Sequence, residues 1–269
     1  MRREPDWIPE LRVSGSPFEA GQQLGAAWAE PLRAEATVRH ADIPWWRHAP
    51  YRRLKERHAP HLPDLYRGMA IGAGISENRV AVQVPASIAD RGSPGDRSAP
   101  SGCTSFAASG RATRNGKPIA GQTKDISRAR GRLFVVLALR LEDSPHSVLT
   151  LTYPGWLYGH GFVAGGCALF RNSLYVAPSD TGMPPTVWGL LALHCPSVED
   201  VMRMTHDHGV NSAMHVTVAD ASGGIIGIEH GKAGTVFLKP EEGIYVHANA
   251  VVEDAALQAT EKDHTLSLI

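Results

Sequence analysis

The sequence predicts an α+β fold in which two antiparallel sheets lie face to face and helices cover them on the outside. Helical spacing dominates the first hundred residues, and strand-like runs follow residue 103. Two further helices separate these strands from the strands of the last third. This order is typical of a four-layer αββα sandwich. No internal repeat appears, so a single domain is expected over residues 1–269.

The composition is that of an ordinary globular chain. Its 269 residues are 43% hydrophobic and 20% charged, which provides enough apolar material for a well-buried core. Because 27 basic residues balance 27 acidic ones, we expect neither nucleic acid nor a membrane surface as a partner. The longest apolar run, residues 133–139, is too short to span a bilayer, and no secretory signal opens the chain. Three cysteines form no disulfide framework, so a cytoplasmic location is expected.

Two helices are expected before residue 80. Ser16, Pro17 and Glu19 match a capping box with proline at the first helical position, and apolar residues follow at helical spacing. A second helix is expected over residues 63–70, ending in glycine-rich residues 72–74. This group lacks the lysine of a phosphate loop, so we expect its glycines to allow close packing of a helix against a sheet.

A β-hairpin is expected to begin at Cys103 and to close at Asp125. The two strand-like runs are separated by Asn115-Gly116, and a type I′ turn requires positive φ at both central residues. The preceding residues 91–100 are rich in turn formers and are expected to form an exposed, flexible segment.

The rest of the chain is expected to be rich in strands. Two helices are expected at residues 186–194 and 198–205, the second capped by Ser197, and a hairpin turn is expected at residues 221–224. The expected strands are residues 133–139, 147–153, 168–176, 214–219, 225–229, 235–238 and 244–246.

Cys103 is the residue around which we expect the chemistry to be organised. A cysteine at the head of a strand, preceded by Gly102, suits a chain that cleaves itself, because glycine has no Cβ to hinder attack on its carbonyl. After cleavage Cys103 would carry a thiol and an α-amine, whose ordinary pKa of about 8 suits a general base. The alternative interpretation is a small buried hydrophobic residue, which is what most free cysteines are.

The surroundings of Cys103 resemble the acyl-coenzyme A:6-aminopenicillanic acid acyltransferase family, the peptidase C45 group. The likeness lies in residues 102–106, 116–122 and 125, and it continues in residues 15–25, 65–75, 171–174, 219–220 with 229, and 247–249. These proteins are autoproteolytic N-terminal nucleophile hydrolases with an αββα fold. The resemblance therefore implies a helical pro-segment, residues 1–102, and a strand-rich segment, residues 103–269, divided at the Gly102–Cys103 bond.

The resemblance also implies roles for four further residues. Asp125 would orient the α-amine of Cys103 by a charge-assisted hydrogen bond, and Asn249 would donate a hydrogen bond to the oxyanion. His247 and Asn172 are weaker candidates for contacts with substrate or oxyanion. On a strand, His247 and Asn249 would share one face. The structural alternatives are a helix cap or ion pair for Asp125, a turn for Asn249 and a sheet hydrogen bond for Asn172.

The sequence departs from the family's pattern at three places. Thr123-Lys124 stands where Asn-Trp or Asn-Arg usually precedes the aspartate, and Ala250 replaces a second histidine. The chain also stops at Ile269, whereas resembling proteins continue, so we expect a fold shortened at the C-terminus or completed by a homodimer partner. These departures motivate the alternative of a catalytically impaired pseudoenzyme or an interaction protein on the same fold.

The expected activity is cleavage or formation of a linear amide through an acyl-cysteine intermediate. The substrate would be a small-molecule amide or an acyl thioester. No cofactor is expected, although a coenzyme A thioester can serve as co-substrate. No metal is expected, because the candidate ligands do not show the spacing of a zinc site. These candidates are His206, His208, His215 and the pair His194 and Cys195.

Overall fold

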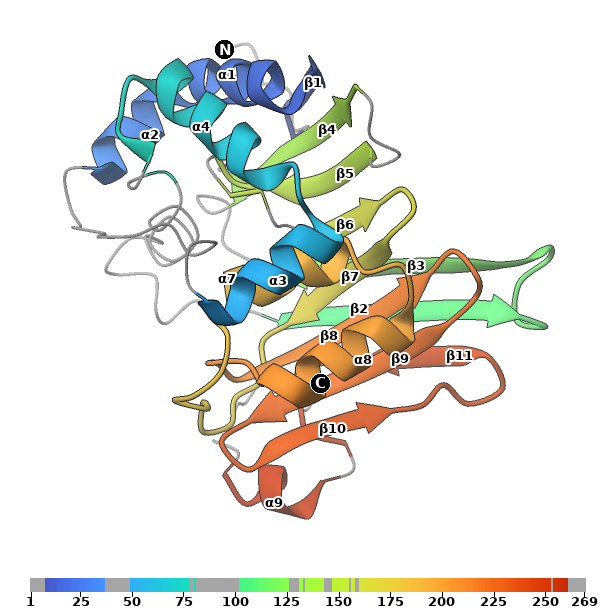
Figure 1. Cartoon of the computed structure of the whole chain (residues 1–269). Helices are drawn as coiled ribbons and strands as arrows, with labels where there is room; N and C mark the ends of the chain where they lie inside the picture. Colours follow the sequence, from blue (N-terminus) through green and yellow to red (C-terminus); the bar gives the residue numbers. More distant parts are fainter. Residues whose placement is uncertain are drawn as a thin grey trace, which may run out of the picture. The chain divides into compact units, whose positions relative to one another are not determined.

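The computed structural model describes residues 8–36, 49–77, 80, 102–125, 131–132, 134–142, 147–154, 156–157, 160–252 and 254–260. The expected exposed segment at residues 91–100 lies outside this part. The chain forms two compact units (Figure 1), one from residues 1–98 and 127–159 and one from residues 99–126 and 160–269. No described helix has the length and apolar character needed to cross a membrane.

In its described residues, the first unit combines a short sheet with four helices. Its strands are β1 (Glu10–Gly15), β4 (Val135–Leu141) and β5 (Ser147–Thr152), and β1 runs parallel to β4 while β5 runs antiparallel to it. Its helices are α1 (Pro17–Ala27), α2 (Ala29–Ala36), α3 (Ala49–His58) and α4 (Leu62–Ala73). The capping box of α1 is confirmed, because Ser16 Oγ accepts from Glu19 N and the Glu19 carboxylate accepts from Ser16 N. The strand β1 was not expected in a region with helical spacing.

Helices α1 and α4 approach each other at backbone distance, and glycines make this possible. A Cβ added to Gly21 of α1 would lie 2.1 Å from the carbonyl oxygen of Leu65, and one added to Gly68 of α4 would lie 2.1 Å from that of Phe18. Gly25 and Gly72 repeat the contact one turn later, at 2.2 Å from backbone oxygens. The expected packing of Gly72 against a sheet is therefore wrong: Gly72 packs helix against helix, because only a residue without Cβ allows two helix backbones this close.

The second unit contains two antiparallel sheets. Five strands follow the order β6 (His160–Val163), β7 (Cys167–Asn172), β8 (Met214–Asp220), β9 (Ile225–Gly231) and β10 (Gly234–Leu238). Three strands form the smaller sheet in the order β11 (Ile244–His247), β2 (Gly102–Gly110) and β3 (Gly116–Asp125). Helices α7 (Pro185–Leu193), α8 (Val198–His208) and α9 (Ala255–Gln258) complete the unit.

The two sheets pack against each other through alternate residues of β2. Ser105 Oγ and Thr217 Oγ1 are hydrogen-bonded at 2.7 Å, and Ala107 lies in a buried cluster with Ala219 and Tyr245. Every residue of β8 and β9 is buried, as expected for strands covered on both faces, because α7 contacts β7 and α8 contacts β8 and β10. The unit thus stacks a helical layer and two sheets, and the expected α+β class is confirmed.

The hairpin of β2 and β3 is confirmed, but its expected turn is wrong. Residues 111–115 form a five-residue loop, and positive φ occurs at Gly110 and Gly116 rather than at Asn115. In the resulting register Cys103 pairs with Lys124, and Gly102 pairs with Asp125. Loop length therefore decides which side chain lies beside the cysteine.

Candidate active site

Cys103 is the second residue of β2, and its side chain points toward the larger sheet. Strand alternation places it on the same face as Ser105, and it is 7% exposed. Its backbone N–H donates a hydrogen bond to Asn249 Oδ1 at 2.8 Å. The predicted nucleophile and one of its predicted partners therefore meet, although 146 residues separate them in the sequence.

Asn249 is held by two hydrogen bonds that fix the orientation of its amide. Its oxygen faces the N–H of Cys103, and its Nδ2 donates to the carbonyl oxygen of Ser173 at 2.7 Å. Since a carbonyl can only accept and a peptide N–H can only donate, the opposite orientation would lose both bonds. The amide oxygen thus faces the nitrogen of the Gly102–Cys103 bond, and the second N–H of Nδ2 remains to donate elsewhere. The expected oxyanion role of Asn249 stays a prediction.

Asp125 lies beside the residue that precedes the cysteine. It ends β3 directly opposite Gly102, and its side chain is exposed. A Cβ added to Gly102 would lie 3.2 Å from Asp125 Oδ2 and 3.5 Å from Asn249 Oδ1. Both predicted partners therefore border the same peptide bond.

Lys124 is a neighbour of the cysteine that the sequence did not indicate as a functional residue. It is the cross-strand partner of Cys103, and its Nζ lies 3.9 Å from Cys103 Sγ. An ammonium at this distance stabilises negative charge on the sulfur, as cations commonly do beside reactive cysteines. Lys124 therefore places a cation beside the predicted nucleophile.

A protein-family model matches a large part of this chain. The family model for acyl-coenzyme A:6-aminopenicillanic acid acyl-transferase matches residues 114–265, which is more than half of the chain. The chain belongs to this acyltransferase family. A search of curated proteins finds no match.

Solved structures similar to this acyltransferase-family chain include two variants of conjugated bile acid hydrolase from Clostridium perfringens. One is 14% identical, with a TM-score of 0.33 over 59% of this chain and 48% of that one. The other is 13% identical, with a TM-score of 0.34 over 56% and 46%. Penicillin V acylase from Agrobacterium tumefaciens is 15% identical, with a TM-score of 0.29 over 55% and 41%. The chain spans less than half the length of these proteins.

Asn172 uses its polar atoms on the protein rather than offering them to a ligand. It is 1% exposed, and its Nδ2 donates to the carbonyl oxygens of His247 and Ala248 at 2.8 and 2.7 Å. Its Oδ1 accepts from Gln122 Nε2 at 3.0 Å. In this member of the acyltransferase family, these contacts match the structural alternative for Asn172, a hydrogen bond that supports the sheet and its loop.

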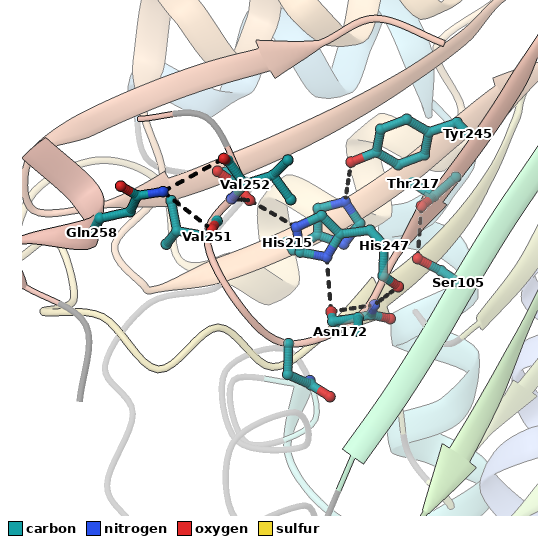
Figure 2. A network of polar contacts seen from close by, with 12 residues as sticks. Ser105, Asn172, His215, Thr217, Tyr245, His247, Val251, Val252 and Gln258 are labelled. Carbon is teal, nitrogen blue, oxygen red and sulfur yellow. Dashed lines mark hydrogen bonds and ion pairs between the residues drawn. The ribbon is translucent and has the colours of Figure 1, made fainter. Parts of the chain in front are cut away.

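His247 belongs to a buried polar cluster that includes His215 and Tyr245 (Figure 2). The expectation that His247 and Asn249 share a strand face is wrong, because β11 ends at His247. The ring of His247 stacks on that of His215 at 3.5 Å between centroids, and its Nε2 lies 2.7 Å from Glu229 Oε1.

His215 Nε2 is hydrogen-bonded to Tyr245 Oη at 2.9 Å. A Cβ added to Gly227 of β9 would lie 1.9 Å from this hydroxyl, so the phenol occupies the space of the missing side chain.

Burial sets the charge of the histidines in this region. Desolvation, together with the charge of His247, holds the pKa of His215 well below its ordinary value. His160 has its pKa lowered by desolvation and by the nearby cations Lys124 and Arg171. Both side chains are therefore neutral at pH 7.

The other two cysteines are placed for packing. Cys167 and Cys195 are both 0% exposed, and the Cys167 thiol donates to the carbonyl oxygen of Cys195. Burial raises the pKa of Cys167 far above its ordinary value, which keeps the thiol protonated and inert. The described residues contain no cluster of three His, Cys, Asp or Glu side chains that could hold a metal ion.

Proposed function

We propose that the chain is a cysteine N-terminal nucleophile enzyme that first cleaves its own Gly102–Cys103 peptide bond. The hydrogen bond from the Cys103 N–H to Asn249 Oδ1 carries this proposal. It holds the nitrogen of the bond to be cut, while the sulfur of the same residue lies beside the Lys124 ammonium. This combination of a held leaving group and a cation at the nucleophile supports attack by Cys103 on the preceding carbonyl.

Self-cleavage would proceed by an acyl shift from nitrogen to sulfur. The Cys103 thiolate adds to the carbonyl carbon of Gly102, the C–N bond breaks, and the nitrogen takes up a proton and leaves as the α-amine. Water then adds to the Gly102 thioester and breaks the C–S bond, which leaves a carboxylate on Gly102 and a free thiol on Cys103. The Asp125 carboxylate, next to Gly102, would stabilise the new ammonium group.

The mature enzyme would use the same groups on an external substrate. The α-amine of Cys103, with an ordinary pKa of about 8, would accept the thiol proton. The sulfur would attack a linear amide or an acyl thioester and form an acyl-cysteine intermediate. We propose that the second N–H of Asn249 Nδ2, which the bond to Ser173 leaves over, stabilises the oxyanion. Water or an amine would then release the acyl group.

The test of self-cleavage is the denatured intact mass of freshly purified protein. The wild type should give two fragments that meet between Gly102 and Cys103, and Cys103→Ala should give one species of 29.0 kDa. Cys195→Ala serves as the matched control, because it removes a buried thiol that follows α7 and should leave cleavage intact. A folded wild type that stays a single chain would overturn the proposal and favour the interaction-protein alternative.

A second experiment separates hydrolase from transferase. The cleaved protein is incubated with a panel of chromogenic amides and acyl thioesters, with and without primary amines as acceptors. Transfer to the amine in competition with water would identify an acyltransferase, and free acid alone would identify a hydrolase. An acyl adduct on the peptide that begins with Cys103 is expected in either case; its absence with every turned-over substrate would contradict the acyl-cysteine intermediate.

A further inference from the structure

The segment that carries Asn249 is a loop, so something other than strand pairing must fix its position. Strand β11 ends at His247, and α9 begins only at Ala255. Asn249 is nevertheless 4% exposed and aligned with Cys103 at hydrogen-bond distance. The contacts that hold the two ends of this loop therefore decide where its amide lies.

One carboxylate oxygen ties both ends of the loop together. Glu229 Oε1 lies 2.7 Å from His247 Nε2 and accepts from Val252 N at 2.9 Å. The side chains of Glu229 and His247 are both 0% exposed. Because His247 and Val252 lie on either side of Asn249 in the sequence, these two contacts of Glu229 Oε1 hold both ends of the segment that carries the Asn249 amide.

Both ring nitrogens of His247 lie at hydrogen-bond distance from oxygen atoms. Its Nδ1 lies 2.7 Å from the carbonyl oxygen of Ala248, which can only accept, and its Nε2 lies 2.7 Å from Glu229 Oε1. The ring of His247 is therefore held at both nitrogens, on one side by its own loop and on the other by β9. The stacked ring of His215 stays neutral, because burial and the charge of His247 lower its pKa.

We propose that Glu229 and His247 form a buried ion pair that positions Asn249 against Cys103. Neither residue reaches the cysteine, so both are positioning residues rather than catalytic ones. Asn172 supports the same loop from the opposite side through its bonds to the carbonyls of His247 and Ala248. In the proposed ion pair His247 donates from both ring nitrogens, whereas a histidine with one ring proton beside an ionised Glu229 would lose one of these two hydrogen bonds. The expected effect on cleavage rests on the proposed function, whereas the contacts of Glu229 and His247 do not depend on it.

The test compares Glu229→Gln with Gln258→Ala. The first keeps the shape and the acceptor for Val252 N but removes the negative charge. The second removes the weak contacts, 3.5 and 3.4 Å long, that Gln258 makes with the carbonyls of Val251 and Val252. We expect self-cleavage to slow by about tenfold or more in Glu229→Gln, because small displacements of a catalytic group are costly. Gln258→Ala should cleave at the wild-type rate.

A spectroscopic measurement separates positioning from mere stability. In the uncleavable Cys103→Ala background, nitrogen-15 NMR should show His247 with protons on both ring nitrogens at pH 7. In Glu229→Gln one of these protons should disappear while the circular dichroism spectrum is retained. This measurement does not depend on cleavage. A wild-type protein that stays uncut would contradict the proposed function, and the NMR experiment would still test the ion pair.

Two outcomes would overturn the inference. One is a singly protonated His247 in the Cys103→Ala protein, which can be measured even if Glu229→Gln fails to fold. The other is a folded Glu229→Gln protein that cleaves at the wild-type rate. Equal slowing in Gln258→Ala would also count against it, because any loosening of the loop would then suffice.

Discussion

The Lys124 ammonium is the cation nearest to Cys103 Sγ, at 3.9 Å, among the contacts described for this sulfur. Two opposite unit charges about 4 Å apart attract each other by about 4 kcal/mol at an effective dielectric constant of 20. This attraction acts on the thiolate and not on the neutral thiol. Lys124 is therefore expected to stabilise the negative charge on the sulfur as it attacks the carbonyl carbon.

Lys124→Met should consequently slow self-cleavage by between about tenfold and about a thousandfold, while Lys124→Arg should retain most of the rate. The rate is measured by intact mass at timed intervals after synthesis in a cell-free system. Lys117→Met is the matched control, since it removes a lysine from the exposed start of the same strand. Equal rates in Lys124→Met and the wild type would show that the charge has no role.

The sequence indicated part of this site. The resemblance selected Cys103, Asp125 and Asn249, and the structure brings all three to one peptide bond. Lys124 could not be placed beside the cysteine, because a two-residue turn at Asn115-Gly116 would set it opposite Ala107 instead. The role of Glu229 was also out of reach, since its partners come from loop positions whose contacts follow no periodicity.

At the scale of elements, the close approach of α1 and α4 depends on glycines. The four positions Gly21, Gly25, Gly68 and Gly72 each lie against the backbone of the other helix. A methyl group there would meet a carbonyl oxygen, which cannot rotate away as a flexible side chain can. The two helices would have to separate to accommodate it.

Gly21→Ala is therefore expected to lower the free energy of unfolding by about 1–3 kcal/mol, although alanine favours helix formation. Gly131→Ala is the control, because a Cβ at Gly131 would meet no atom within 4 Å. Urea unfolding followed by circular dichroism measures both. A Gly21→Ala protein as stable as the wild type would mean that the helices adjust at no cost.

The elements with strong local signals were predicted well. The helix cap at Ser197 is confirmed, because its Oγ accepts from Asp200 N, and α8 extends three residues beyond the expected end to His208. Strands β1 and β6 were missed, because each is short and has few apolar residues in alternation. β1 is defined mainly by its pairing with β4, more than a hundred residues later, which no local pattern can show.

At the scale of the whole molecule, three buried histidines are held neutral. The pKa of His160, of His215 and of His230 is lowered, first of all by desolvation. The unfolded chain binds protons at these positions below about pH 6.5, whereas the folded chain does not. Their contribution to stability is therefore complete above that pH and is lost progressively as the pH falls below it.

We expect the free energy of unfolding to fall with a slope of up to about 4 kcal/mol per pH unit below pH 6. Urea unfolding of the Cys103→Ala protein at pH 7.5 and at pH 5.5 measures this difference. His206→Ala should show the same pH dependence, because His206 is exposed and lies at the end of α8. Equal stability at the two pH values would contradict the buried, neutral state.

The contact between the Tyr245 phenol and the backbone of Gly227 restricts which residues can occur together at positions 227 and 245. A side chain at position 227 and a tyrosine at position 245 cannot coexist, since the Cβ of one would overlap the hydroxyl of the other. Relatives that keep the tyrosine must therefore keep the glycine. Lineages that lose either residue must pass through an intermediate with a cavity, or change both residues within a short time. Substitutions at these two positions are therefore expected to be correlated among related sequences.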